Sequence, residues 1–70
     1  MVMEKIKKFI EENWNNFSNL ECSEVVEYKN LNEFDSEIID YLKSFYRFDY
    51  KGICVYLVER EIWVENMLAE

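Results

Sequence analysis

Carboxylates are the side chains with the greatest capacity for chemistry in this sequence. They recur in close pairs: Glu11/Glu12, Glu24/Glu27, Glu37/Asp40 and Glu59/Glu61. Glu37 and Asp40 would share one face of a helix, where two carboxylates could hold a divalent cation. Because such pairs more often form part of a solvated surface, the pairing alone does not indicate a catalytic centre or a metal site.

The residue types that complete most catalytic sites are missing. The sequence has no histidine and one glycine, Gly52. Histidine is the commonest general base and the usual activator of serine and cysteine nucleophiles, and glycine-rich loops are needed to cradle phosphates. We therefore expect no enzymatic activity and no cofactor.

The two cysteines, Cys22 and Cys54, are distant in sequence and form no C-x-x-C motif. Without histidine, a tetrahedral zinc site would lack its usual nitrogen and sulfur ligands. We predict no metal site and no disulfide, and interpret both cysteines as small apolar residues in a reducing compartment.

The charge balance indicates the class of partner. Fifteen acidic side chains against eight basic ones give a net charge of −7 at pH 7. Such a surface repels nucleic acid and anionic membranes, whereas a basic protein surface is its electrostatic complement. We predict a partner-binding acidic patch made of Glu11, Glu12, Glu21, Glu24 and Glu27.

The order of charges along the first expected helix supports a binding role for its acids. Lysines 5, 7 and 8 come early and Glu11 and Glu12 come late. This order opposes the helix dipole, so it costs the helix a little stability and suggests that the acids serve another purpose. An acidic surface kept for solubility is the alternative, and the sequence leaves it open.

A run of aromatic and charged residues, FYRFDY, extends from Phe45 to Tyr50. Six consecutive residues cannot all face inward from a helix end, so some must reach the surface, where tyrosine and arginine are enriched in binding hot spots. The alternative is that the rings cap a small core. We predict a second partner-binding patch made of Tyr46, Arg47, Phe48 and Tyr50.

Hydrophobic periodicity predicts the elements that position these side chains. Apolar residues recur at helical spacing from Val2 to Phe17, which predicts an amphipathic helix. The segment Cys22–Lys29 is typical of a short strand. A second helix is expected to begin at Asn32 or Asp35, where a side chain can cap it, and to end at Phe48.

The remaining elements follow Gly52, which can adopt positive φ and predicts a turn at Tyr50-Lys51-Gly52. Residues 53–58, apolar on both faces, are typical of a central strand. Residues 56–59 and 62–65 then form a hairpin around Arg60 and Glu61, or residues 61–69 form a helix; we favour the hairpin. The result is one α+β domain, residues 1–70, of order α-β-α-β-β, with two amphipathic helices on one face of a small antiparallel or mixed sheet.

A chain of this length supplies a small core, which natural mini-proteins usually reinforce. Two tryptophans, five tyrosines and five phenylalanines make dense aromatic packing the first expectation and oligomerisation the second, as a homodimer. No signal peptide or membrane span is visible in the sequence. We expect the protein in the cytoplasm, or in the host cytoplasm if a virus encodes it.

These features favour a non-catalytic, acidic protein-binding module that inhibits or modulates a basic, nucleic-acid-handling protein. Such a module can act as a DNA mimic, presenting carboxylates where its partner expects phosphates, as small acidic inhibitors of phages and mobile elements do. That comparison rests on size and charge. The alternative is a structural or regulatory subunit that assembles with itself or a larger complex through an aromatic surface.

Overall fold

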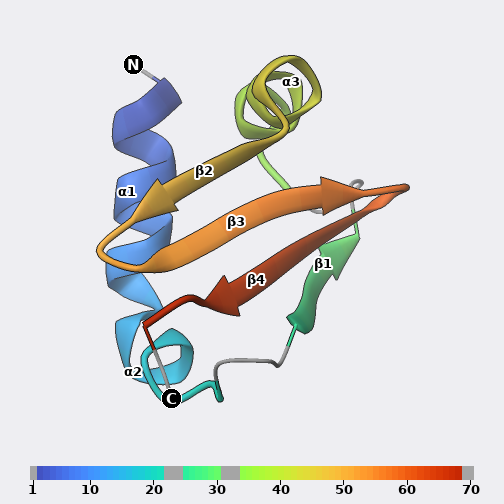
Figure 1. Cartoon of the computed structure of the whole chain (residues 1–70). Coiled ribbons are helices and arrows are strands. Elements are labelled where there is room, and N and C mark those ends of the chain that lie inside the picture. The colour runs from blue at the N-terminus through green and yellow to red at the C-terminus, as the bar shows by residue number, and fades with distance from the viewer. Residues whose placement is uncertain (1, 22–24, 31–33, 69–70) are drawn as a thin grey trace.

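The computed structural model describes residues 2–21, 25–30 and 34–68, which form three helices and four strands (Figure 1). In chain order these are α1 (Val2–Glu12), α2 (Trp14–Phe17), β1 (Val25–Asn30), α3 (Ser36–Phe45), β2 (Arg47–Tyr50), β3 (Ile53–Val58) and β4 (Glu61–Asn66). The strands form an antiparallel sheet of order β1-β4-β3-β2. The predicted α+β class is confirmed, and the element order agrees apart from a divided first helix and one additional strand, β2.

The first predicted helix is divided at Asn13. The side-chain amide of Asn13 donates to the backbone oxygen of Phe9 at 2.9 Å, and its φ of −110° lies outside the helical range. Asparagine side chains compete in this way with the hydrogen bonds of a helix, which explains why α1 and α2 are separate. The apolar face nevertheless continues across the break, since Ile6, Ile10 and Phe17 are buried.

The second predicted helix is α3. It starts after Asp35, one of the two predicted starting points, and it ends earlier than predicted. Asp35 is its N-cap and accepts a hydrogen bond from the backbone nitrogen of Glu37 at 2.8 Å. The helix ends at Phe45 and not at Phe48, because Tyr46 takes a φ of +71° while its nitrogen still donates to the oxygen of Leu42. Asn32, the other start that the sequence predicted, lies outside the described residues.

The aromatic run that the sequence suggested to be a helix end is instead mostly strand β2. It pairs with β3 through a two-residue turn in which Lys51 and Gly52 both have positive φ, 52° and 81°. Two positive values are the signature of a type I′ turn, whose twist matches that of the flanking strands. The turn predicted at Gly52 is therefore confirmed.

The hairpin alternative for the C-terminal segment is correct, with its turn one residue earlier than predicted. Val58 pairs with Glu61, so the turn consists of Glu59 and Arg60. A shift of one residue changes which side chains face the core. In the observed register Ile62 is buried, while Trp63 points to the opposite face and is half-buried.

The predicted strand at residues 22–29 corresponds to β1, which forms one edge of the sheet (Figure 1). It pairs with β4, with an irregularity in the register between Glu27 and Lys29. Residues 22–24 lie outside the described part of the chain.

The core lies between the helices and one face of the sheet. Alternate residues of β2, β3 and β4 meet apolar side chains from all three helices. The buried cluster consists of Ile6, Ile10, Phe17, Ile38, Leu42, Phe48, Ile53, Val55, Ile62 and Val64. Within the described residues no helix covers the opposite face, which we call the open face. None of the described helices combines the length and apolarity needed to cross a bilayer.

Candidate binding surface

The predicted acidic patch is described only in part. Glu11 and Glu12, at the end of α1, and Glu21, after α2, are exposed. Glu24 lies outside the described residues, and Glu27 is placed by its backbone, opposite Trp63 in the pairing of β1 with β4.

Glu11 contributes to the tertiary structure. It was assigned to a binding patch because its position in the helix suggested that it adds little to stability. Its Oε2 accepts a hydrogen bond from the hydroxyl of Tyr50 at 3.0 Å and from Lys51 Nζ at 3.3 Å. These contacts, that of Tyr50 above all, hold the pKa of Glu11 below its ordinary value. Glu11, near the end of α1, therefore connects this helix to the β2–β3 turn.

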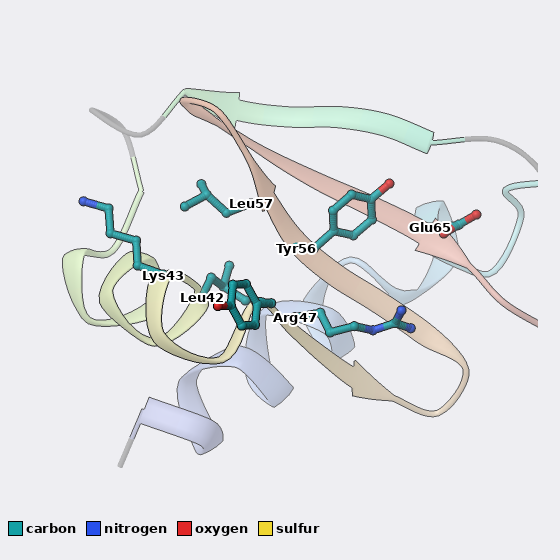
Figure 2. A pocket seen from close by; sticks show the side chains of 7 residues that line it. Leu42, Lys43, Arg47, Tyr56, Leu57 and Glu65 are labelled. Carbon is teal, nitrogen blue, oxygen red and sulfur yellow. The ribbon is translucent and has the colours of Figure 1, made fainter.

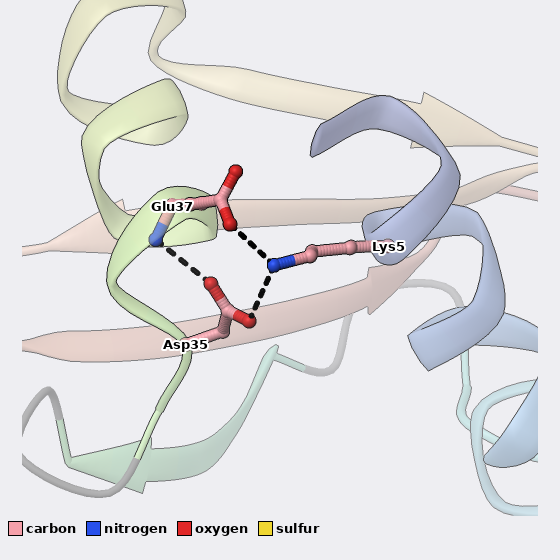
Figure 3. A network of polar contacts seen from close by, with 3 residues as sticks. All are labelled: Lys5, Asp35 and Glu37. Carbon is pink, nitrogen blue, oxygen red and sulfur yellow. Dashed lines mark hydrogen bonds and ion pairs between the residues drawn. The ribbon is translucent and has the colours of Figure 1, made fainter. Parts of the chain in front are cut away.

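The position of Lys5, near the start of α1, is also explained by contacts with another element. Lys5 Nζ reaches across to the start of α3, where it binds the carboxylates of Asp35 at 3.3 Å and of Glu37 (Figure 3). The hydrogen bond to Glu37, followed by that to Asp35, raises the pKa of Lys5. Contacts between elements thus account for Lys5 and Glu11, and the dipole argument no longer assigns Glu11 to a partner. Glu37 is also occupied by this contact, and within the described residues no cluster of acids and cysteines is arranged to hold a metal ion.

The predicted aromatic patch does not form one surface. Tyr46 is 79% exposed and Arg47 is exposed, whereas Phe48 is part of the core and Tyr50 is half-buried against Glu11. The alternation of side chains along β2 sends Phe48 toward the helices and Arg47 toward the open face.

Tyr46 and Arg47 instead line a cavity of about 520 Å³ at the start of β2 (Figure 2). The cavity exists because β2 begins at Arg47, opposite Tyr56, so β3 continues past its neighbour and its edge is exposed at Leu57. The last turn of α3 forms the other wall. The lining residues are Leu42, Lys43, Tyr46, Arg47, Tyr56, Leu57 and Glu65.

The cavity opens onto the open face, where the strand registers bring further side chains together. Arg47, Tyr56 and Trp63 occupy one row across β2, β3 and β4. Asp49, Cys54 and Glu65 occupy the next row of the same three strands. Because directly paired residues of an antiparallel sheet lie on the same face, these rows form a continuous surface.

The two carboxylates give the open face a negative potential. Burial raises the pKa of the Cys54 thiol to about 12, and the neighbouring Asp49 and Glu65 contribute to the rise. The pKa of Tyr56 is raised by burial and next by the charge of Glu65. Arg47 offsets part of this charge, since its guanidinium donates to both oxygens of Asp49, at 2.9 and 3.1 Å.

Trp63 carries an unsatisfied donor on this face. Its Nε1 is buried and has no hydrogen-bond partner among the residues that the structure describes. A buried N–H without a partner is a cost to the fold, and such groups call for an explanation.

Sequence reasoning missed the central residues of this surface, Tyr56, Trp63 and Glu65. A signal was present: Glu61, Trp63 and Glu65 are spaced by two, which places them on one face of a strand. Comparisons with protein-family models, with curated proteins and with solved structures find no match for this chain. The surface is therefore interpreted from its own geometry.

Proposed function

We propose that this protein is a non-catalytic acidic module that binds a basic protein and inhibits or modulates it, with nucleic-acid-handling proteins as the partner class. One observation carries the proposal: the open face presents Tyr56 and Trp63 side by side with the carboxylate of Glu65. Half-buried aromatic rings next to charges that complement the partner are typical of binding hot spots.

The overall charge supports this partner class. A net charge of −7 attracts a basic surface at long range and accelerates association. In this proposal the carboxylates occupy positions where the partner would bind the phosphates of nucleic acid. Direct binding of nucleic acid by this chain is disfavoured by the same charge. We place the complex in the cytoplasm, or in the host cytoplasm if a virus encodes the protein.

The chemistry of the open face favours binding over catalysis. Cys54 is a nucleophilic residue type, but a pKa of about 12 leaves its thiol protonated at neutral pH. Arg47 is engaged by Asp49 within the same strand. Neither Cys54 nor Arg47 is therefore available as a reactive group on the open face.

A second candidate function rests on two exposed aromatic residues at the end of α3. Phe45 and Tyr46 are 62% and 79% exposed, which is unusual for large aromatic side chains in a small protein. They suit a subunit that assembles, with itself or a larger complex, through an aromatic contact. The two functions differ in the variant that abolishes binding and in the response to salt.

Affinity capture with matched baits tests the proposal. The wild type, Glu65→Lys, Tyr46→Ala and the control Glu4→Lys would each be immobilised and incubated with extract of the organism that encodes the protein. We expect a basic protein on the wild type, Tyr46→Ala and Glu4→Lys baits, released by raised salt, and its loss from Glu65→Lys. A partner that resists salt and is lost from Tyr46→Ala would contradict the proposal and support the aromatic subunit.

A further inference from the structure

We propose that the open face recognises arginine side chains of its partner, in preference to lysine. The inference rests on the proposed function and names the chemical group that the surface receives. It is carried by the pairing of two aromatic residues, by the position of one carboxylate and by an arginine that the face already holds.

The aromatic pair offers a flat platform. Tyr56 and Trp63 are direct partners in the register of β3 and β4, and both are half-buried. Side chains in such a pair have Cβ atoms about 5 Å apart, so one planar group can contact both rings. A guanidinium is planar and stacks on aromatic faces.

Glu65 supplies the charge beside this platform. It follows Trp63 by two positions on the same face of β4, and its charge raises the pKa of the Tyr56 hydroxyl. Within the described residues Glu65 makes no ion pair, whereas Asp49 is occupied by Arg47. A carboxylate next to an aromatic surface is therefore left for a cation from outside the chain.

The chain itself provides an example of the expected contact. Arg47 lies in the same row as Tyr56 and Trp63, and its guanidinium donates to both oxygens of Asp49. An incoming arginine would repeat this arrangement with Glu65 on the other side of Tyr56. Lysine is a weaker candidate, because its ammonium is compact, strongly hydrated and unable to form the two parallel hydrogen bonds.

Peptide titrations followed by NMR test the inference on the full chain. Nona-arginine and nona-lysine have the same formal charge and would each be added to ¹⁵N-labelled protein at low salt. The readout is the indole N–H signal of Trp63, with that of Trp14, which lies in α2 on the helix side, as an internal control. Assignment uses Trp63→Phe.

We expect the Trp63 signal to shift with nona-arginine and to reach saturation. The affinity for nona-arginine should be about fivefold higher than that for nona-lysine, which is the ratio that about 1 kcal/mol of stacking provides. Glu65→Gln should remove most of that preference, and Glu4→Gln, a control at an exposed position in the first turn of α1, should keep it. If Glu65→Gln fails to fold, Tyr56→Leu removes one ring of the platform and preserves its apolar area.

The outcomes separate this inference from the proposed function. Equal affinities for the two peptides, unchanged by Glu65→Gln, would overturn the arginine preference and leave binding of a basic partner in place. Binding that leaves the Trp63 signal unmoved would also overturn it, because the site would then lie elsewhere. If neither peptide shifts any signal at low salt, the inference and the proposed function both fail.

Discussion

Asn66 donates a hydrogen bond from its side-chain amide to the backbone oxygen of Leu20, at 3.2 Å and across 46 positions of sequence. The same amide donates to the oxygen of Ser18, and its own oxygen accepts from the backbone nitrogen of Leu68. Asn66 is 6% exposed and, within the described part of the chain, is the buried polar residue. It ties the end of β4 to the segment that follows α2.

Replacing Asn66 with alanine should therefore destabilise the protein strongly. The partly buried carbonyls of Ser18 and Leu20 would lose their donor, at a cost of about 2 kcal/mol in the free energy of unfolding. Urea denaturation measures the loss. Asn19→Ala is the matched control, since Asn19 makes an exposed amide–carbonyl bond to Asn15; we expect a change within about 0.5 kcal/mol. Similar costs for the two variants would contradict the role given to Asn66.

Gly52 is needed for a second reason besides its positive φ. A Cβ placed there would lie 2.3 Å from side-chain atoms of Leu68. We expect Gly52→Ala to cost the left-handed strain of about 1 to 2 kcal/mol plus the clash. In the double variant Gly52→Ala/Leu68→Ala the clash is relieved. The double variant should therefore lose less stability than the two single variants lose together. Strict additivity in a double-mutant cycle would show that Leu68 does not pack on the turn.

The sequence predicted the elements whose signals are local. The turn at Tyr50-Lys51-Gly52 was predicted from Gly52, and the central strand was predicted from the apolar run of residues 53–58. The end of α3 could not be predicted in this way. It is set by the positive φ of Tyr46, and a tyrosine side chain does not favour that conformation as glycine would. The four residues of β2 also alternate between exposed and buried positions, a pattern too short to outweigh the preceding helical periodicity.

The candidate site depended on contacts that no local pattern contains. Glu11 was assigned from its position in a helix, yet its role is set by Tyr50 and Lys51, about forty residues later. Tyr56 and Trp63 become neighbours only through the register of the hairpin, and a turn placed one residue late would put them out of register. Charge and composition predicted an acidic surface, and topology determines which acids share a face.

Glu59 offers a route to a more stable protein. It is the first residue of the β3–β4 turn and has a φ of 55°, a conformation that disfavours side chains with a Cβ. Glu59→Gly should remove strain of about 1 to 2 kcal/mol and lose part of that gain to unfolded-state entropy, leaving a net stabilisation of up to about 1 kcal/mol. Thermal melts measure the change. Lys51→Gly is the comparison, because it relieves similar strain and also removes the contact with Glu11, so a smaller gain is expected.

Glu11 should make the stability of the protein depend on acid pH. The pKa of Glu11 in the folded state is lowered, first by the Tyr50 hydroxyl and then by Lys51, below its value in the unfolded chain. A lowered folded pKa means that the unfolded state binds the proton more readily, so this contribution to stability is complete above the unfolded pKa of about 4.3 and is lost as the pH falls through the folded pKa.

The Glu11→Gln variant tests this linkage. Glutamine keeps an oxygen that can accept from Tyr50 and removes the charge that attracts Lys51. We expect the wild type to unfold at a higher urea concentration than Glu11→Gln at pH 7, and the two midpoints to converge as the pH falls through the lowered pKa of the carboxylate in the folded state. Glu12→Gln removes the same charge from the same helix end and should show no such convergence. A difference between wild type and Glu11→Gln that persists unchanged at acid pH would mean that the charge of Glu11 does not stabilise the fold.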